Sequence, residues 1–295
     1  MNIFKAYHPV VNFLYFTLMI AFSMFFMNPI CLVISLFCSF AYSIVLNGIK
    51  AVKFNFLYMI PVLLAASLIN PAFSHRGVTI LTYLPSGNPL TLESIYFGFG
   101  TGAMLAAVIC WFSCYNAVMT SDKFIYLFGK VIPSLSLVLS MVLRFVPKFK
   151  AQAKIIANAQ RAAGADISSG SIIQRGKSGV KILSILTTWA LENAIETSDS
   201  MKSRGYGLKG RTAFSIYTFT KRDIAALTVI VILAVYTAAG YISGNISFSY
   251  YPYIKMADIN FYSASIYTVY FALGILPVII EAKEELRWKH LKSKI

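Results

Sequence analysis

Two short basic stretches near the middle of the sequence hold the residues best suited to bind a protein partner. Residues 159–164 read AQRAAG and residues 200–207 read SMKSRGYG. Each follows a helical pattern and contains a terminal glycine, which readily takes the left-handed conformation of a helix C-terminal cap. Arg204 complements the negative end of the helix dipole and can make forked hydrogen bonds to carboxylates. A plain capping arginine is the alternative that the residues alone leave open.

A phosphate-binding loop is nearly present but fails on two counts. Residues 205–212 (GYGLKGRT) approach the pattern of Gly, four residues, Gly-Lys and Ser or Thr. Arg211 stands where the pattern requires lysine, and the segment follows a helix where the pattern requires a strand. We therefore expect no nucleotide site in this chain. If ATP drives the protein, a separate subunit hydrolyses it.

No arrangement of residues predicts catalysis, a cofactor or a metal site. Glu192 and Glu196 share a helix face, but they lie among basic residues, where a solvated or partner-facing role is favoured. Cys110 and Cys114 also share a face, without the nearby ligands that a metal needs, and are interpreted as packing residues. The histidines are scattered at predicted membrane edges: His8, His75 and His290. The chain is predicted not to be an enzyme.

The composition is that of an integral membrane protein. Of the 295 residues, 58% are hydrophobic and only 13% are charged, about half the charged share of a soluble domain. A helix needs roughly 20 apolar residues to cross the hydrocarbon core of a bilayer. Such runs predict an all-α, polytopic fold with about six transmembrane helices, at residues 9–26, 30–46, 54–73, 94–118, 224–243 and 262–280.

Basic residues are divided unevenly between the two sides of these spans. With the N-terminus inside, 24 of the 26 Lys and Arg residues fall on one side, and only Arg76 and Lys255 fall on the other. The positive-inside rule makes the crowded side cytoplasmic, together with both termini. The net charge of +15 thus reflects topology and a partner surface, since no nucleic-acid-binding motif is present. We predict a multi-pass protein of the cell membrane without a nucleic-acid partner.

The spans divide the sequence into three predicted regions. Residues 1–118 form an N-terminal membrane region, residues 119–222 a cytoplasmic region, and residues 223–295 a C-terminal membrane region with a charged tail. The cytoplasmic region is expected to contain two long helices, at about 134–163 and 172–204, each roughly 45–50 Å long.

Small and apolar residues on these two helices predict that they cross closely. The first part of the first helix, residues 134–147, is apolar but too short to span a membrane, so we expect it to lie along the membrane face or against a partner. The predicted crossing stripe comprises Ala151, Ile155, Ala159 and Ala162 on the first helix and Leu183, Leu186, Ala190, Ala194, Ser198 and Met201 on the second.

Several of these motifs resemble the transmembrane T component of energy-coupling factor (ECF) transporters. The resemblance is carried by residues 203–206 (SRGY), by 159–164 and by 143–147 (LRFVP). Residues 28–29 (NP) and 87–93 (GNPLTLE) are also similar to that family. In the family, two coupling helices end in short Ala-Arg-Gly-type motifs that dock into two cytoplasmic ATPase subunits. The resemblance therefore implies that the two long helices are coupling helices.

The resemblance also implies which residues make each contact. ATPase docking is implied for Arg161, Ala162, Ala163, Gly164, Ser203, Arg204, Gly205 and Tyr206. Contact with the membrane-embedded substrate-capture subunit, the S component, is implied for Leu135, Leu139, Val142, Leu143, Val146, Leu183 and Leu186. The first motif departs from the family, because Ala163 stands where the family has arginine and Arg161 lies about 200° around the helix. One ATPase contact is therefore expected to be weaker or more apolar.

The function implied is that of a scaffold that couples ATP hydrolysis to the import of vitamins or transition-metal ions through the S component. The alternative is a conventional ABC-type permease subunit that forms its own substrate path. An intramembrane enzyme is disfavoured, because the spans lack a catalytic set of residues. The sequence does not identify the solute.

Overall fold

The computed structural model describes the chain except for residues 1–2, 75, 84–88, 130–131, 165–170, 207, 209–216 and 293–295. The chain divides into two compact units. The membrane unit comprises Met1–Lys123 and Tyr217–Ile295, and the central unit comprises Phe124–Ile216. A short helix, α5 (Ser121–Gly129), runs across the boundary between them.

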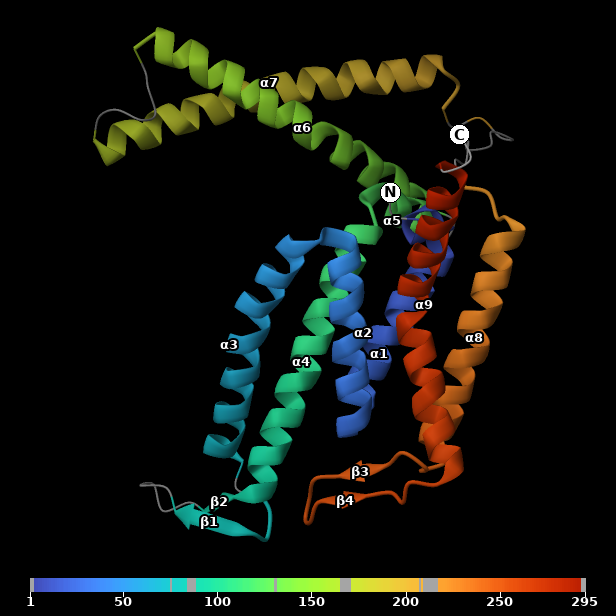
Figure 1. Ribbon diagram of the computed structural model, residues 1–295. Helices are drawn as coiled ribbons and strands as arrows, with labels where there is room; N and C mark the ends of the chain where they lie inside the picture. Colours follow the sequence, from blue (N-terminus) through green and yellow to red (C-terminus); the bar gives the residue numbers. More distant parts are fainter. Residues whose placement is uncertain are drawn as a thin grey trace. The chain divides into compact units, whose positions relative to one another are not determined.

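Long helices form the body of the membrane unit (Figure 1). Among the described residues, five helices are long and apolar enough to cross a bilayer, and the shorter α1 is also apolar. Their bounds are α1 Pro9–Phe25, α2 Pro29–Asn47, α3 Ile49–Phe73, α4 Leu92–Val118, α8 Lys221–Ile242 and α9 Phe261–Lys292, after a single 3₁₀ turn at Phe4–Ala6. The prediction of an all-α polytopic membrane protein is confirmed.

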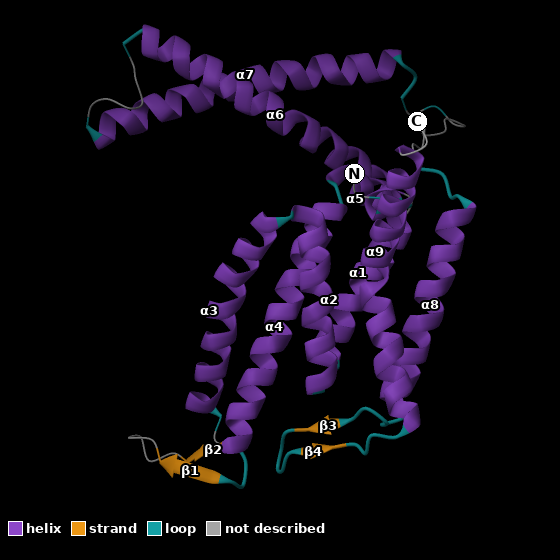
Figure 2. Cartoon of the chain, viewed as in Figure 1, coloured by secondary structure: helices purple, strands orange, loops and turns teal. Residues whose placement is uncertain are grey.

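Two small antiparallel hairpins, which the sequence did not predict, join helices at one end of this unit (Figure 2). One pairs β1 (Ile80–Tyr83) with β2 (Pro89–Thr91), and the other pairs β3 (Phe248–Ser249) with β4 (Lys255–Met256). The prolines and the glycine of residues 85–89 predict a turn there, and residues 85–88 lie outside the described residues. Strands this short are stabilised by backbone pairing and carry too few residues for an alternating pattern.

The last helix is longer than the predicted span. We expected a span at 262–280 followed by a charged helical tail, and α9 runs through both without interruption to Lys292. Pro277 lies inside it, as Pro61 and Pro71 lie inside α3. A proline removes one backbone donor, which neighbouring helices can compensate in a membrane bundle.

Aromatic side chains fill the centre of the membrane unit. Phe4, Tyr15 and Trp111 are fully buried, with ring centroids 5.4 Å apart for Phe4 and Tyr15 and 6.0 Å apart for Tyr15 and Trp111. The indole nitrogen of Trp111 donates to Ser35 Oγ at 3.0 Å, and the Tyr15 hydroxyl donates to the carbonyl of Gly274 at 3.0 Å. Each polar tip thus has a partner inside the apolar core, which avoids a desolvation cost.

Polar side chains at the ends of α2 and α8 cap these helices and also bind segments that are distant in the sequence. Asn28 caps α2 through its Oδ1, which accepts from Ile30 N at 2.9 Å, and its amide nitrogen donates to the Ile246 carbonyl at 3.2 Å. Asp223 closes a capping box with Thr220 at the start of α8 and also accepts from the backbone N–H of His8 at 3.1 Å. The chain before α1 is therefore tied to α8 by a buried carboxylate.

Helices α3 and α4 approach closely at two glycines one turn apart. A Cβ at Gly98 would lie 3.1 Å from the Ser67 carbonyl oxygen, and one at Gly102 would lie 2.9 Å from the Leu63 carbonyl oxygen. Only a residue without a side chain permits that backbone contact, as in other membrane helix pairs.

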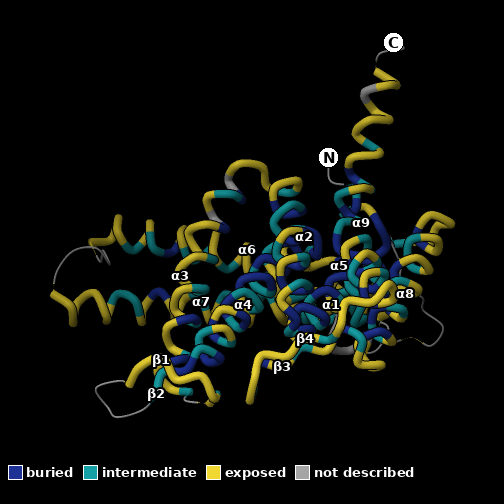
Figure 3. The backbone as a smooth tube through the Cα atoms, turned by 60° about the horizontal axis from the view of Figure 1, so that its bottom comes forward, coloured by how far each residue is buried: buried dark blue, intermediate teal, exposed yellow. Residues whose placement is uncertain are grey.

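The central unit consists mainly of two long helices. Helix α6 (Pro133–Ala162) is continuous through Pro147, and α7 (Ile172–Ser203) runs back across it, so the pair crosses antiparallel (Figure 1). Lengths of 30 and 32 residues correspond to roughly 45 and 48 Å. Most of their described residues are exposed or only half-buried (Figure 3). An extended pair with so little covered surface offers long faces for other proteins.

Candidate interaction surface

The tip of α7 is shaped by the left-handed backbone of Gly205. Its φ is +74°, its N–H donates to the Lys202 carbonyl at 2.9 Å, and the next N–H, of Tyr206, donates to the Met201 carbonyl at 3.0 Å. This pair of bonds is the Schellman cap, which turns the chain off the helix axis. Arg204 is the capping residue itself and is exposed, so its side chain leaves from the end of the helix.

The tip of α6 also ends at a glycine with a left-handed backbone. Gly164 has φ +79°, and its N–H donates to the Arg161 carbonyl at 3.1 Å. Ala162 is the last helical residue, Ala163 is the cap, and both are exposed together with Arg161 and Gly164. The two left-handed glycines that the sequence predicts at these tips are confirmed.

The two tips lie at opposite ends of the crossed pair (Figure 1). Because α6 and α7 run antiparallel, the tip of α7 lies beside the first half of α6, while the tip of α6 is at the far end of that helix. From Arg144, next to the α7 tip, to Ala162 the rise along α6 is roughly 27 Å. That separation is too long for both tips to occupy one docking groove.

The crossing itself uses different residues from those predicted. Among the described residues of α6 and α7, Ile156 and Ile182 are the buried ones, with 7% and 8% of their surface exposed. Beside them, the rings of Phe149 and Trp189 meet edge to face with centroids 5.6 Å apart. On α6 the predicted stripe is wrong in register, since its member Ile155 is 60% exposed, whereas on α7 its members Leu186, Ala190 and Met201 are half-buried. Ile155 and Ile156 are adjacent and equally apolar, so the sequence allows either to face α7. In the structure Ile156 is the buried one.

The residues implied in S-component contact are apolar, and those whose side chains are described are exposed or half-buried. Val142, Val146 and Leu183 are 49%, 54% and 61% exposed. Leu143 is also exposed, and Leu139 and Leu186 are half-buried. The side chain of Leu135 lies outside the described residues. Exposed branched aliphatic residues at this density are typical of membrane-facing or partner-facing helices.

Arg144, which the sequence identifies only as part of the LRFVP motif at 143–147, lies at the α7 tip. Arg144 and Arg204 line the same hollow, of about 310 Å³, together with Met201 and Tyr206 of α7. No local pattern could have identified this pairing, because it depends on how far α7 runs back along α6. The Schellman cap contributes, since it brings Tyr206 back over Met201.

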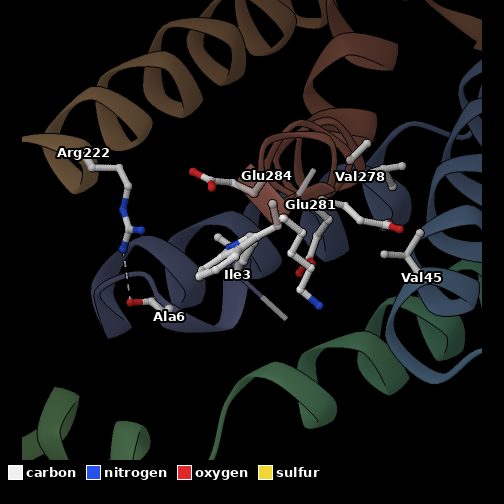
Figure 4. A pocket seen from close by; sticks show the side chains of 11 residues that line it. Ile3, Ala6, Val45, Arg222, Val278, Glu281 and Glu284 are labelled. Atoms are coloured by element: carbon white, nitrogen blue, oxygen red, sulfur yellow. Dashed lines mark hydrogen bonds between the residues drawn. The ribbon is translucent and has the colours of Figure 1, made fainter. Parts of the chain in front are cut away.

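Another hollow, of about 660 Å³, lies in the membrane unit beside the end of α9 (Figure 4). Glu281 accepts from the backbone N–H of Phe4 at 3.3 Å, and Arg222 donates to the carbonyl of Ala6 at 3.5 Å. The Arg222 guanidinium also lies 4.3 Å from the centre of the Tyr7 ring. These groups attach the N-terminal segment to α8 and α9, which is a structural role.

No candidate metal site is evident in the part of the chain that the structure describes. Within it, no group of three or more His, Cys, Asp or Glu side chains could hold a metal ion. The four cysteines are buried and unpaired by disulfides. Glu192 and Glu196 are exposed on α7, as a solvated or partner-facing pair requires.

Comparison with known proteins identifies similar chains. The "Energy-coupling factor transporter transmembrane protein EcfT" of Lactobacillus helveticus is 39% identical over 108 residues, 36% of this chain and 39% of that protein. The protein of the same name from Brevibacillus brevis is 36% identical over 110 residues, 36% of this chain and 42% of that protein. The one from Bacillus subtilis is 35% identical over 101 residues, 34% of this chain and 38% of that protein.

These matches span about two fifths of the length of the curated relatives. No family model matches the chain. The resemblance to the transmembrane T component of ECF transporters is confirmed by these relatives, over about a third of the chain.

Proposed function

We propose that this chain, a relative of ECF transmembrane proteins, is the membrane scaffold that couples two cytoplasmic ATPase subunits to a substrate-capture S component. The observation that carries the proposal is the crossed α6–α7 pair, with a capped, exposed tip at each far end. Helices held at their crossing move as rigid levers, so displacement of a tip is transmitted along roughly 45 Å of helix.

Two ATPases fit the pair better than one. The tips are at opposite ends of the crossing, and the axial rise between them is roughly 27 Å. Each tip offers its own docking residues, Arg161 to Gly164 on α6 and Ser203 to Tyr206 on α7. The α7 tip carries an arginine at its cap, while the α6 tip has Ala163 there, so we expect the two contacts to differ in strength.

The S component is proposed to bind the exposed apolar residues of α6 and α7 that the resemblance implies. Those on α6, among them Val142 and Val146, have spacings of four, three, one and three residues and so follow one side of the helix. In lipid, apolar faces gain little by burial alone, and shape complementarity between helices decides the contact. The solute, proposed to be a vitamin or a transition-metal ion, is then selected by the S component and not by this chain.

The scaffold is placed in the cell membrane with both termini and the central unit in the cytoplasm. The uneven distribution of Lys and Arg supports this orientation. ATP hydrolysis is assigned to the partner subunits, and the chain itself is proposed to be non-catalytic.

The proposal is tested by purifying the tagged chain from host membranes in mild detergent and identifying its partners by mass spectrometry. Two chains with phosphate-binding loops and one small membrane protein are expected. Arg204→Glu should remove an ATPase or uncouple ATP hydrolysis from uptake, with membrane insertion unchanged. Normal co-purification and full uptake in that variant would refute the docking role, and substrate binding by the isolated chain would favour a permease.

A further inference from the structure

The hollow at the α7 tip is built from both helices of the central unit. Helix α7 contributes Met201, Arg204 and Tyr206, and α6 contributes Leu137, Ser140, Met141 and Arg144. The α6 residues have spacings of three, one and three, which place them on one face of the helix. This composite site exists only while α6 and α7 are crossed.

The described residues that line the hollow are mainly basic or apolar. It holds two guanidinium groups, Arg144 and Arg204, and none of the described residues that line it is acidic. Guanidinium groups bind carboxylates through paired, charge-assisted hydrogen bonds. The remaining surface is provided mainly by methionine, leucine and tyrosine side chains, which suit the methylene stem of a glutamate.

We propose that this hollow binds one acidic side chain of the ATPase that docks on α7, held by Arg144 together with Arg204. The inference rests on the proposed function and adds a second helix to the contact. Arg, Met and Tyr are residue types enriched where proteins meet, and Tyr206 is 51% exposed at the edge of the hollow. These features favour a protein carboxylate over a lipid phosphate.

The position of Arg144 gives the contact a mechanical consequence. Val142 and Val146 lie two residues before and after it, about 200° around the helix. One face of this segment therefore receives the ATPase, and the opposite, exposed face carries the proposed S-component contact. Motion of the ATPase then acts on α6 directly, at the segment that carries the S component.

The test measures the binding of purified ATPase, recovered with the wild-type chain as above, to the chain in nanodiscs of neutral lipid. Arg144→Glu should weaken binding about tenfold or more, as Arg204→Glu does. The loss of affinity in the double variant should be smaller than the product of the two single losses, because both arginines hold the same carboxylate. Lys150→Glu, the same charge reversal on another face of α6, should change binding by no more than about twofold.

A rescue experiment separates direct contact from misfolding. Replacing the matching acidic residue of the ATPase by lysine should restore binding to the Arg144→Glu chain, and far-ultraviolet circular dichroism should be unchanged. Wild-type binding by Arg144→Glu, with loss in Arg204→Glu, overturns this inference and leaves the proposed function standing. Wild-type binding by both variants overturns the inference and the docking role of Arg204 together. Binding that needs anionic lipid, and is lost in neutral nanodiscs for the wild type, assigns the hollow to a phospholipid and also overturns it.

Discussion

Gly164 and Gly205 each turn the chain away from a helix with a positive φ, of +79° and +74°. An L-residue in that conformation costs roughly 1–2 kcal/mol. At Gly205 a Cβ would also lie 3.0 Å from Leu208 Cδ1, whereas at Gly164 no atom of the described chain lies within 4 Å of it. The two tips therefore depend on glycine for the same backbone reason, and the α7 tip has an additional steric reason.

Gly205→Ala is predicted to loosen the α7 tip. The amides of Gly205 and Tyr206 that close the cap should exchange with solvent roughly 5–30-fold faster, in line with a loss of 1–2 kcal/mol. Gly176→Ala is the matched control, since Gly176 lies inside α7 with open space around it and alanine is the better helix former. Hydrogen exchange measured by mass spectrometry checks both. Equal exchange in Gly205→Ala and the wild type would contradict the cap's role.

Lys123, which lies outside the predicted spans, should make the stability of the fold depend on pH. It is 5% exposed, and its Nζ donates to the carbonyl of Lys5. Burial, and to a lesser extent the charge of Lys5, lower the pKa of Lys123 from 10.5 to about 8. Between these values the unfolded chain binds more protons than the folded chain, so stability rises with pH across that window.

We predict that the melting temperature of the wild type rises relative to that of Lys123→Met between pH 8 and pH 10. The corresponding gain in unfolding free energy is on the order of 1–3 kcal/mol, since methionine has no proton to lose. Thermal unfolding in detergent at several pH values measures the difference between the two proteins. A constant difference across the window would show that Lys123 keeps its ordinary pKa in the fold.

At the scale of the element, the α6–α7 crossing depends on few side chains. Ile156→Ala and Ile182→Ala should each destabilise the pair by about 2–4 kcal/mol, because each leaves a cavity where apolar surface was buried. Ile155→Ala and Leu183→Ala are matched controls, with the same chemistry at exposed neighbouring positions. Amide exchange along α7 reports the loss. Comparable effects in the exposed and buried pairs would mean that another register holds the crossing.

The sequence predicted helix ends better than helix contacts, for a physical reason. Glycine caps are local, so Gly164 and Gly205 could be placed from the residues around them. The crossing register is not local, because Ile155 and Ile156 are equally apolar and only the partner helix distinguishes them. The same holds for Arg144, whose proximity to the α7 tip depends on the length of chain that connects the two helices.

At the scale of the whole molecule, one chain combines a well-packed bundle with an open pair of helices. The membrane unit buries an aromatic core around Trp111 and satisfies its buried caps, among them Asp223. Among the described residues of the central unit, only Ile156 and Ile182 are buried. The proposed scaffold role would need this division, since the bundle would stay fixed in lipid while the exposed helices remain available to partners.

The number of crossings decides which side of the membrane the tips occupy. If α1, α2, α3, α4, α8 and α9 all cross, the chain passes the bilayer an even number of times, and the β1–β2 and β3–β4 hairpins lie opposite the termini. The positive-inside rule then puts the hairpins outside the cell. This orientation requires the tips of α6 and α7 to be cytoplasmic, where ATPases can reach them.

Cysteine labelling tests this orientation in a chain whose four buried cysteines are first replaced by alanine or serine. A membrane-impermeant maleimide applied to intact cells should label Thr82→Cys, in strand β1, and Tyr253→Cys, between β3 and β4, because both positions are exposed. It should label Ser203→Cys only after the membrane is permeabilised, because the reagent cannot otherwise reach a tip that lies in the cytoplasm. Labelling of Ser203→Cys in intact cells would place the tip outside, beyond the reach of any ATPase, and the coupling role would be untenable.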